Sequence, residues 1–155
     1  MSWRHHGLCP WGSIKMIKYK KLPANIEDLI PKALTYLQSM PDIFFAYLFG
    51  SFGRGKPLPL SDVDIAVYLK ESTVVQERKM EILGALIDIL QTDEIDVVIL
   101  NNAPLPLRRR ILESKRVVVD HEPFRRHHYE SLTMREYFDF SIKEKDILYR
   151  RFLSG

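Results

Sequence analysis

Two aspartates with one residue between them, Asp62 and Asp64, open an apolar run that continues to Leu69. Residues two apart on a β-strand project from the same face, so these carboxylates are expected to lie together. Like charges held close repel each other, and such a pair usually shares a cation or a proton. Because carboxylate oxygens are hard ligands, the pair favours Mg²⁺, which typically bridges carboxylates and substrate phosphates.

A third aspartate, Asp96, lies in another strand-like segment, Glu94 to Leu100. If this segment pairs beside the strand of Asp64, Asp96 faces the other two carboxylates. Three such carboxylates meet the requirement of phosphoryl transfer with two metal ions, and Asp96 is also a candidate general base. The alternative is that Asp93, Glu94 and Asp96 are solvated residues of a turn.

A glycine and a serine follow a short apolar run, Phe44 to Phe49, which is typical of a buried strand. Gly50 lets an anion approach the backbone closely, and the Ser51 hydroxyl adds a donor. Ser51 is otherwise a turn former. Arg54 is either a phosphate contact or a solvated loop charge.

The spacing Gly50-Ser51, ten residues, then Asp62-Val63-Asp64 resembles the signature of the nucleotidyltransferase superfamily related to DNA polymerase beta. The short chain is similar to its minimal nucleotidyltransferase branch, the MntA-type antitoxins that are paired with HEPN-domain toxins. The resemblance spans Ile43 to Leu100, and Arg54-Gly55 and Ser61 also fit it.

This resemblance implies an enzyme that transfers AMP from ATP to a hydroxyl of a partner protein, a HEPN-type ribonuclease toxin. It implies that Asp62, Asp64 and Asp96 are catalytic ligands of two Mg²⁺ ions. The nucleotide-binding residues that it implies are Gly50, Ser51, Arg54 and Ser61. Two alternatives stay open, namely a small-molecule nucleotidyltransferase of the aminoglycoside-modifying kind and a non-catalytic antitoxin that only binds its toxin.

Length and composition predict an ordinary globular domain. The 155 residues carry a net charge of +3, and 46% of them are hydrophobic. No apolar stretch reaches the roughly 18 to 20 residues of a membrane span, and a lone Cys9 fits a reducing cytoplasm. We expect one domain over residues 16–155, preceded by a disordered leader or added segment over residues 1–15. A metal site from His5, His6 and Cys9 is the alternative for that segment.

The expected fold class is α/β, a small mixed sheet with flanking helices. Asn25 is a plausible cap of a helix that reaches Leu37, although Pro31 predicts two pieces or a later start. A helix from about Glu71 to Leu90 then connects the strands of Asp64 and Asp96 as a crossover. The remaining expected elements are a short helix at 105–113, an edge strand at 116–120 and a helical tail from residue 123.

Two basic runs, Arg108 to Arg110 and Arg125 to His128, lack the interleaved aromatic residues of a base-stacking surface. We therefore expect no direct nucleic-acid binding. The runs are interpreted as a solvated face or a surface for an acidic protein.

Overall fold

A four-stranded sheet, in the order β3-β2-β1-β4, forms the centre of the computed structural model, which describes residues 22–55, 57 and 61–153. The strands are β1 (Ile43–Phe49), β2 (Val63–Leu69), β3 (Ile95–Ile99) and β4 (Arg116–Asp120). β1 is antiparallel to both β2 and β4, whereas β2 and β3 are parallel. The predicted mixed sheet and edge strand are confirmed. The predicted leader at residues 1–15 lies outside the described residues.

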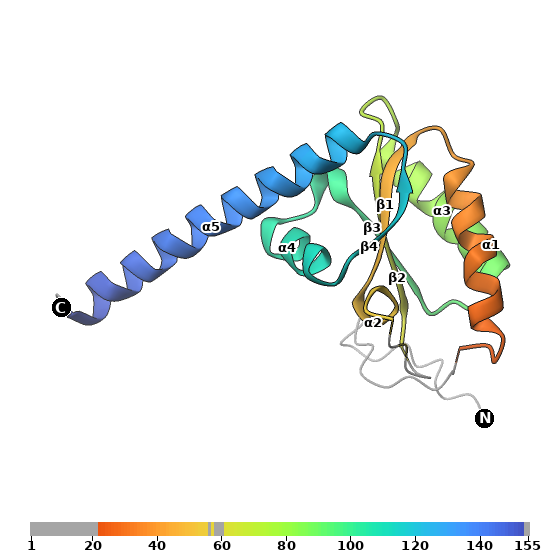
Figure 1. The fold of residues 1–155 in the computed structure, drawn as a ribbon, viewed down its shortest axis with the longest axis horizontal. Helices are drawn as coiled ribbons and strands as arrows, with labels where there is room; N and C mark the ends of the chain where they lie inside the picture. Colours follow the sequence, from red (N-terminus) through yellow and green to blue (C-terminus); the bar gives the residue numbers. More distant parts are fainter. Residues whose placement is uncertain (1–21, 56, 58–60, 154–155) are drawn as a thin grey trace.

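Helices cover both faces of the sheet (Figure 1). α1 (Ile26–Gln38) and α3 (Val75–Leu90) pack on one face, and α4 (Leu105–Ser114) with the start of α5 (Pro123–Leu153) lies on the other. Successive side chains of β2 point alternately to the two faces of the sheet. Val63, Ile65 and Val67 join the core under α1 and α3, and Ala66 joins the core under α4 and α5. Asp64 therefore points to the α4 side of the sheet.

α1 is one continuous helix that contains Pro31. The predicted division at this proline is wrong. Pro31 cannot donate a backbone hydrogen bond, but a stripe of five buried apolar residues runs along the helix and offsets that loss. The stripe consists of Ile26, Leu29, Ile30, Ala33 and Leu37.

The crossover helix α3 begins at Val75, later than the sequence pattern predicts. Residues 70–73 form a turn instead, in which the Thr73 N–H donates to the Lys70 carbonyl at 3.0 Å. Glu71 lies in this turn and forms an exposed ion pair with Arg125. The 3₁₀ turn η2 (Leu100–Asn102) then follows β3 and leads to α4.

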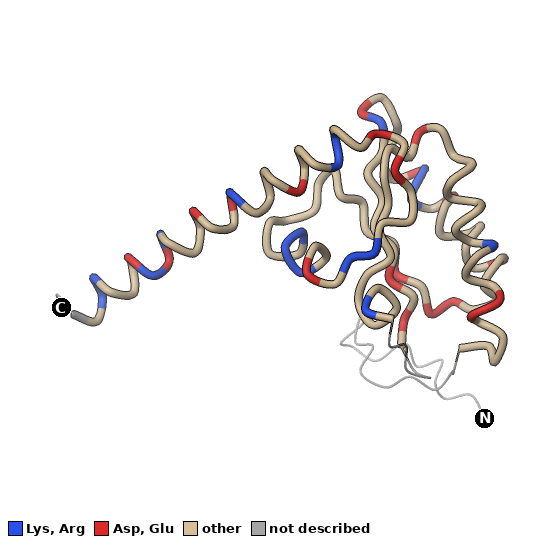
Figure 2. The backbone as a smooth tube through the Cα atoms, viewed as in Figure 1, with Lys and Arg blue, Asp and Glu red and all other residues tan. Residues whose placement is uncertain are grey.

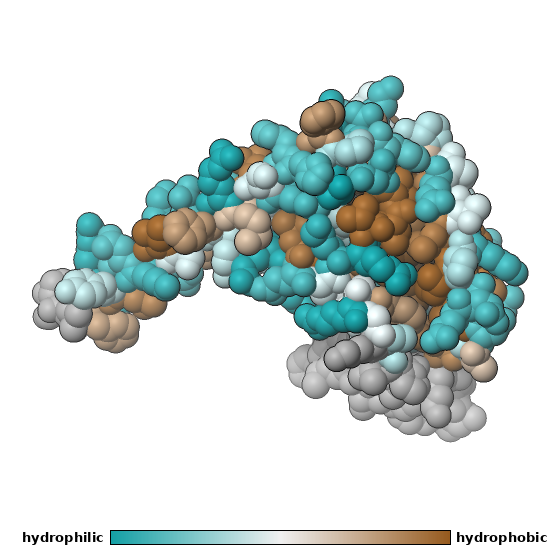
Figure 3. Space-filling view, in the orientation of Figure 1, coloured by the Kyte–Doolittle hydropathy of each residue, from teal (hydrophilic) through white to brown (hydrophobic). Residues whose placement is uncertain are grey.

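The last helix, α5, is 31 residues long and extends far beyond the sheet (Figure 1). Its first turns pack against β1 and α4. The projecting half carries mixed charges along its length (Figure 2) and exposed apolar side chains (Figure 3). Among the described residues, no helix combines the length and apolar character needed to cross a membrane.

Candidate active site

The turn after β1 and the second aspartate of β2 lie in direct contact. Phe49, the last residue of β1, is the register partner of Asp64. Gly50 follows with a φ of +68°, and a Cβ added there would lie 2.4 Å from Oδ2 of Asp64. Only glycine meets both conditions, since an L side chain rarely adopts this φ and would collide with the carboxylate. The predicted turn is a single helical turn, α2 (Gly50–Gly53).

Asp96 lies beside Asp64 in the parallel register of β2 and β3. The predicted pairing of these strands is therefore found. Neighbouring strands are about 4.8 Å apart, so the two side chains leave adjacent backbones on the same face. Asp62 directly precedes β2, at the two-residue spacing from Asp64 that the sequence predicts. Asp96 is exposed, whereas Asp62 and Asp64 are half-buried.

The three aspartates fit a Mg²⁺ site in ligand type, and Asp64 and Asp96 fit it also in backbone placement. Gly50 leaves the Asp64 carboxylate in contact with the backbone at the end of β1, and Asp96 is its register neighbour. Hard oxygen donors of this kind suit Mg²⁺. In the described part of the chain, however, no three carboxylate, histidine or cysteine side chains converge as ligands of one ion. The structure thus brings Asp64 and Asp96 together through their strands without gathering all three carboxylates.

The C-terminal end of α4 is fixed against the Gly50 turn. The Gly50 N–H donates to Oγ of Ser114 at 2.9 Å, and Ser114 is buried. A Cβ on Gly53 would lie 2.1 Å from the Ser114 carbonyl oxygen and 2.6 Å from that of Leu48. The lack of a side chain at Gly53 therefore allows α4 to lie directly on the turn.

A cavity of about 110 Å³ lies between the turn and α4. It brings together three residues that the sequence predicts for the site, Gly50, Arg54 and Asp64. Ser51, Ser61, Asp62 and Asp96 do not line it. The other walls come from Phe49 and from α4, which contributes Leu107, Arg110, Glu113 and Ser114.

Arg110 and Ser114 are site residues that the sequence analysis missed. Their spacing of four residues puts them on one face of a helix, which is visible in the sequence. The sequence does not reveal that this face turns toward Gly50, because that depends on how α4 packs on the sheet. The sequence-based interpretation also treats arginines 108–110 as one solvated run, although only Arg110 of the three lines this cavity.

Most arginines of the two basic runs form internal contacts. Arg108 donates to Glu136 at 3.2 Å, and Arg109 pairs with Glu113. Hydrogen bonds from Arg126 to Asp120, at 2.9 and 3.0 Å, lower the pKa of that carboxyl. The interpretation as a solvated basic face is wrong for these three arginines.

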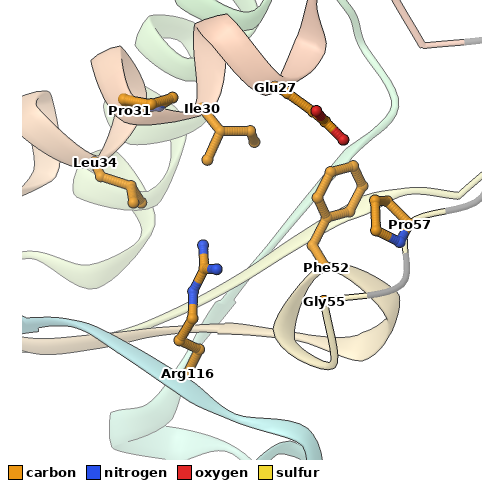
Figure 4. A pocket seen from close by; sticks show the side chains of 8 residues that line it. All are labelled: Glu27, Ile30, Pro31, Leu34, Phe52, Gly55, Pro57 and Arg116. Carbon is orange, nitrogen blue, oxygen red and sulfur yellow. The ribbon is translucent and has the colours of Figure 1, made fainter.

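A second cavity, of about 330 Å³, lies between α1 and the end of α2 (Figure 4). Ile30, Leu34 and Phe52 give it apolar walls, and the side chains of Glu27 and Arg116 point toward it. It contains none of the three aspartates, and Phe52 belongs to the core on the α1 side of the sheet. The cavity beside Asp64 is therefore the better candidate for phosphate chemistry.

The sequence matches the family model described as polymerase beta, nucleotidyltransferase, over residues 32–123. The chain belongs to this family of nucleotidyltransferases. The match includes the Gly50 turn, all three aspartates and α4, so the candidate site lies within the family domain. No curated protein matches the sequence.

Solved structures with the same fold include chains of toxin-antitoxin complexes. One is a toxin-antitoxin with AMP-PNP, at 24% identity and a TM-score of 0.62 over 79% of this chain and 94% of that chain. Another is a tri-AMPylated Shewanella oneidensis HEPN toxin in complex with MNT antitoxin, at 23% identity and a TM-score of 0.57. It covers 79% of this chain and 92% of that chain. A chain of the MntA-HepT toxin-antitoxin complex matches at 22% identity and a TM-score of 0.57, over 81% of this chain and 96% of that chain.

Proposed function

We propose that this protein is an antitoxin that transfers AMP from ATP, with Mg²⁺, to a hydroxyl group of a HEPN-type toxin and thereby silences it. The observation that carries the proposal is the contact of the Asp64 carboxylate with Gly50, in register with Asp96. This contact supports the proposal because it puts a glycine turn, which is suited to phosphate, next to a carboxylate, which is suited to a metal ion. The similar fold of an MNT antitoxin in complex with an AMPylated HEPN toxin supports this choice of acceptor.

Each residue of the site has a defined part in this reaction. Asp62, Asp64 and Asp96 would hold the metal ions, and the bound ions would supply activation of the attacking hydroxyl and neutralisation of the leaving pyrophosphate. Gly50 and Ser51 bind the terminal phosphates, Arg54 adds positive charge, and Ser61 is a further nucleotide-binding residue. The chain then accelerates the reaction mainly by positioning the substrates and by neutralising charge.

The exposed apolar residues of α5 support a protein as the acceptor. Phe138, Ile142, Ile147 and Phe152 are each more than half exposed. Apolar side chains gathered on one surface element usually mark a contact with another macromolecule. A reaction that consumes ATP, together with the single cysteine, also supports a cytoplasmic site of action.

The test is transfer of label from ATP labelled at the α-phosphate, with Mg²⁺ and a co-expressed HEPN-type toxin. We expect label on the toxin band and restored growth of the cells that carry it. Asp64→Asn removes a ligand charge and is expected to lower transfer at least a hundredfold, since metal ions supply most of the charge neutralisation. Chelation of Mg²⁺ should have the same effect.

Asp88→Asn is the matched control, because Asp88 is an exposed aspartate on α3 within the same domain. This variant should transfer label as the wild type does. Label that appears only in a small molecule would replace the proposal by the aminoglycoside-type alternative. Silencing of the toxin that survives Asp64→Asn would contradict the enzymatic mechanism and favour inhibition by binding alone.

A further inference from the structure

α4 follows the third strand and ends beside the Gly50 turn, and it carries three consecutive arginines with different surroundings. Arg108 contacts Thr133, Glu136 and the ring of Tyr129. Arg109 pairs with Glu113 and lies over the Tyr137 ring, 4.4 Å from its centroid. The charges of these two arginines thus serve the packing of α4 and α5.

Arg110 differs from both. Its side chain is exposed, and the described part of the chain contains no ion pair or side-chain hydrogen bond for it. It lines the cavity beside Asp64 together with Arg54, so two guanidinium groups border a space that also contains the Gly50 turn. The one carboxylate that α4 adds to this cavity, Glu113, is already paired with Arg109.

We propose that Arg110 binds the β- and γ-phosphates of the nucleotide, opposite the Gly50 turn. An arginine with unused donors is suited to phosphate, since its planar fork makes two parallel hydrogen bonds to phosphate oxygens. The carboxylate of Asp64 repels an anion, so a triphosphate that enters the same cavity needs cations beside it. Arg110 supplies one from α4, and Arg54 supplies one from the end of the turn.

Ser114 is a positioning residue in this arrangement. Its Oγ accepts the Gly50 N–H at 2.9 Å, one helical turn beyond Arg110 on the same face of α4. The same hydrogen bond therefore fixes the distance between the turn and the helix that carries Arg110. The nucleotide is then bound between two walls that are joined directly to each other.

This inference rests on the proposed function, because it assumes a nucleoside triphosphate as the substrate. The test measures binding of ATP and of AMP to the full-length protein with Mg²⁺ by titration calorimetry, without any partner. Arg110→Gln is expected to weaken the binding of ATP about tenfold or more, which is the usual effect of losing a charge-assisted hydrogen bond. Affinity for AMP should change less than twofold, because AMP lacks the β- and γ-phosphates.

Two further variants separate binding from folding. Arg135→Gln, at an exposed arginine on α5, should bind ATP as the wild type does. Arg110→Lys keeps the charge without the fork and should recover part of the lost affinity. Ser114→Ala should also lower the affinity for ATP. Ser114→Thr, which retains a hydroxyl, should restore that affinity.

The outcomes distinguish this inference from the function on which it rests. Equal ATP affinities of the wild type and Arg110→Gln would overturn the role of Arg110 and leave the proposed AMP transfer intact. Equal losses for ATP and AMP would also overturn it, because they would indicate a general disturbance of the site. A wild type that binds Mg²⁺-ATP, weakened selectively by Arg110→Gln, but that transfers no AMP would support Arg110 and contradict the proposed function. A wild type that binds no ATP would overturn both.

Discussion

At the scale of single residues, two glycines of this chain have opposite expected tolerance to a methyl group. A Cβ on Gly53 would lie 2.1 Å from the Ser114 carbonyl oxygen, a backbone atom that cannot turn aside. We expect Gly53→Ala to lower the free energy of unfolding by about 1–3 kcal/mol, as overpacking does. Urea denaturation measures the change. An unfolding midpoint equal to that of the wild type would mean that α4 can move away from the turn at little cost.

Gly84→Ala is the matched control for this prediction. Gly84 lies inside α3, and an added Cβ would meet no atom within 4 Å. Alanine is favoured over glycine within a helix, so the free energy of unfolding should rise by about 0.5–1 kcal/mol. The same substitution thus acts in opposite directions at two sites, and loss of stability in both variants would contradict the argument from local space.

Gly50→Ala is expected to affect the site more than the fold. The new Cβ would lie 2.4 Å from Oδ2 of Asp64, which is the end of a side chain and can rotate away, and a φ of +68° adds backbone strain. Displacement of this carboxylate should lower Mg²⁺-dependent ATP binding at least tenfold, which corresponds to about 1.4 kcal/mol. Calorimetric titration with ATP and Mg²⁺ measures it. Unchanged ATP affinity would contradict the placement of Asp64 in the binding site.

At the scale of elements, a half-buried carboxylate joins α5 to the sheet. Glu130 of α5 accepts hydrogen bonds from the Tyr47 hydroxyl at 2.8 Å, from Lys115 at 3.0 Å and from Arg126 at 3.2 Å. Burial alone would raise the pKa of Glu130, but the hydrogen bonds from Tyr47 and Lys115 outweigh it and hold that pKa below the ordinary value of 4.5. Arg126 similarly lowers the pKa of Asp120 below 3.8.

A lowered pKa in the folded state makes the stability depend on pH. The contribution of Glu130 is fully present above about pH 5 and is lost as the pH falls through the lowered pKa, because the unfolded state binds the proton first. Glu130→Gln should therefore flatten the fall in unfolding free energy between about pH 5 and pH 3. Glu144→Gln, on the exposed part of α5, is the control. Parallel pH profiles for the two variants would contradict this role of Glu130.

The order of elements could be predicted from the sequence because local patterns determine it. The apolar runs of β1, β2 and β3 and the helical stripe of α3 are periodic over enough residues to be recognised. The register of Asp64 with Asp96 follows once the crossover places β3 beside β2. The predicted start of α3 was wrong by a few residues, because residues 70–73 form a hydrogen-bonded turn, which leaves no periodic signal in the sequence.

The α4 side of the site could not be predicted in the same way. Arg108, Arg109 and Arg110 are the same residue type in a row. Arg108 pairs with Glu136 of α5 and Arg109 lies over the Tyr137 ring of α5, whereas Arg110 lines the cavity. The hydroxyl of Ser114 acquires its role from the approach of α4 to Gly50, which involves residues 64 positions apart. Contacts at this separation leave no periodic signal in a single sequence.

At the scale of the whole molecule, the chain consists of a packed body and a projecting helix. Residues 142–152 are all exposed, and the ion pair of Arg150 with Asp146, at 3.3 Å, lies within the helix itself. This part of α5 adds no side chain to either apolar cluster of the body. Isolated helices of this length are marginal in water, so the apolar residues of this segment gain most when another surface covers them.

A variant that ends at Phe140 tests this division. Its urea midpoint should equal that of the full chain within error, because residues 142–152 are exposed and join neither apolar cluster of the body, and its affinity for Mg²⁺-ATP should be unchanged. Binding of a hydrophobic dye should fall, since the variant loses Ile142, Ile147 and Phe152, which are 51%, 59% and 75% exposed. Under the proposed function, capture of the toxin should weaken while nucleotide binding persists. A lower midpoint would instead mean that the projecting half stabilises the body, and its apolar residues would then need no partner to explain them.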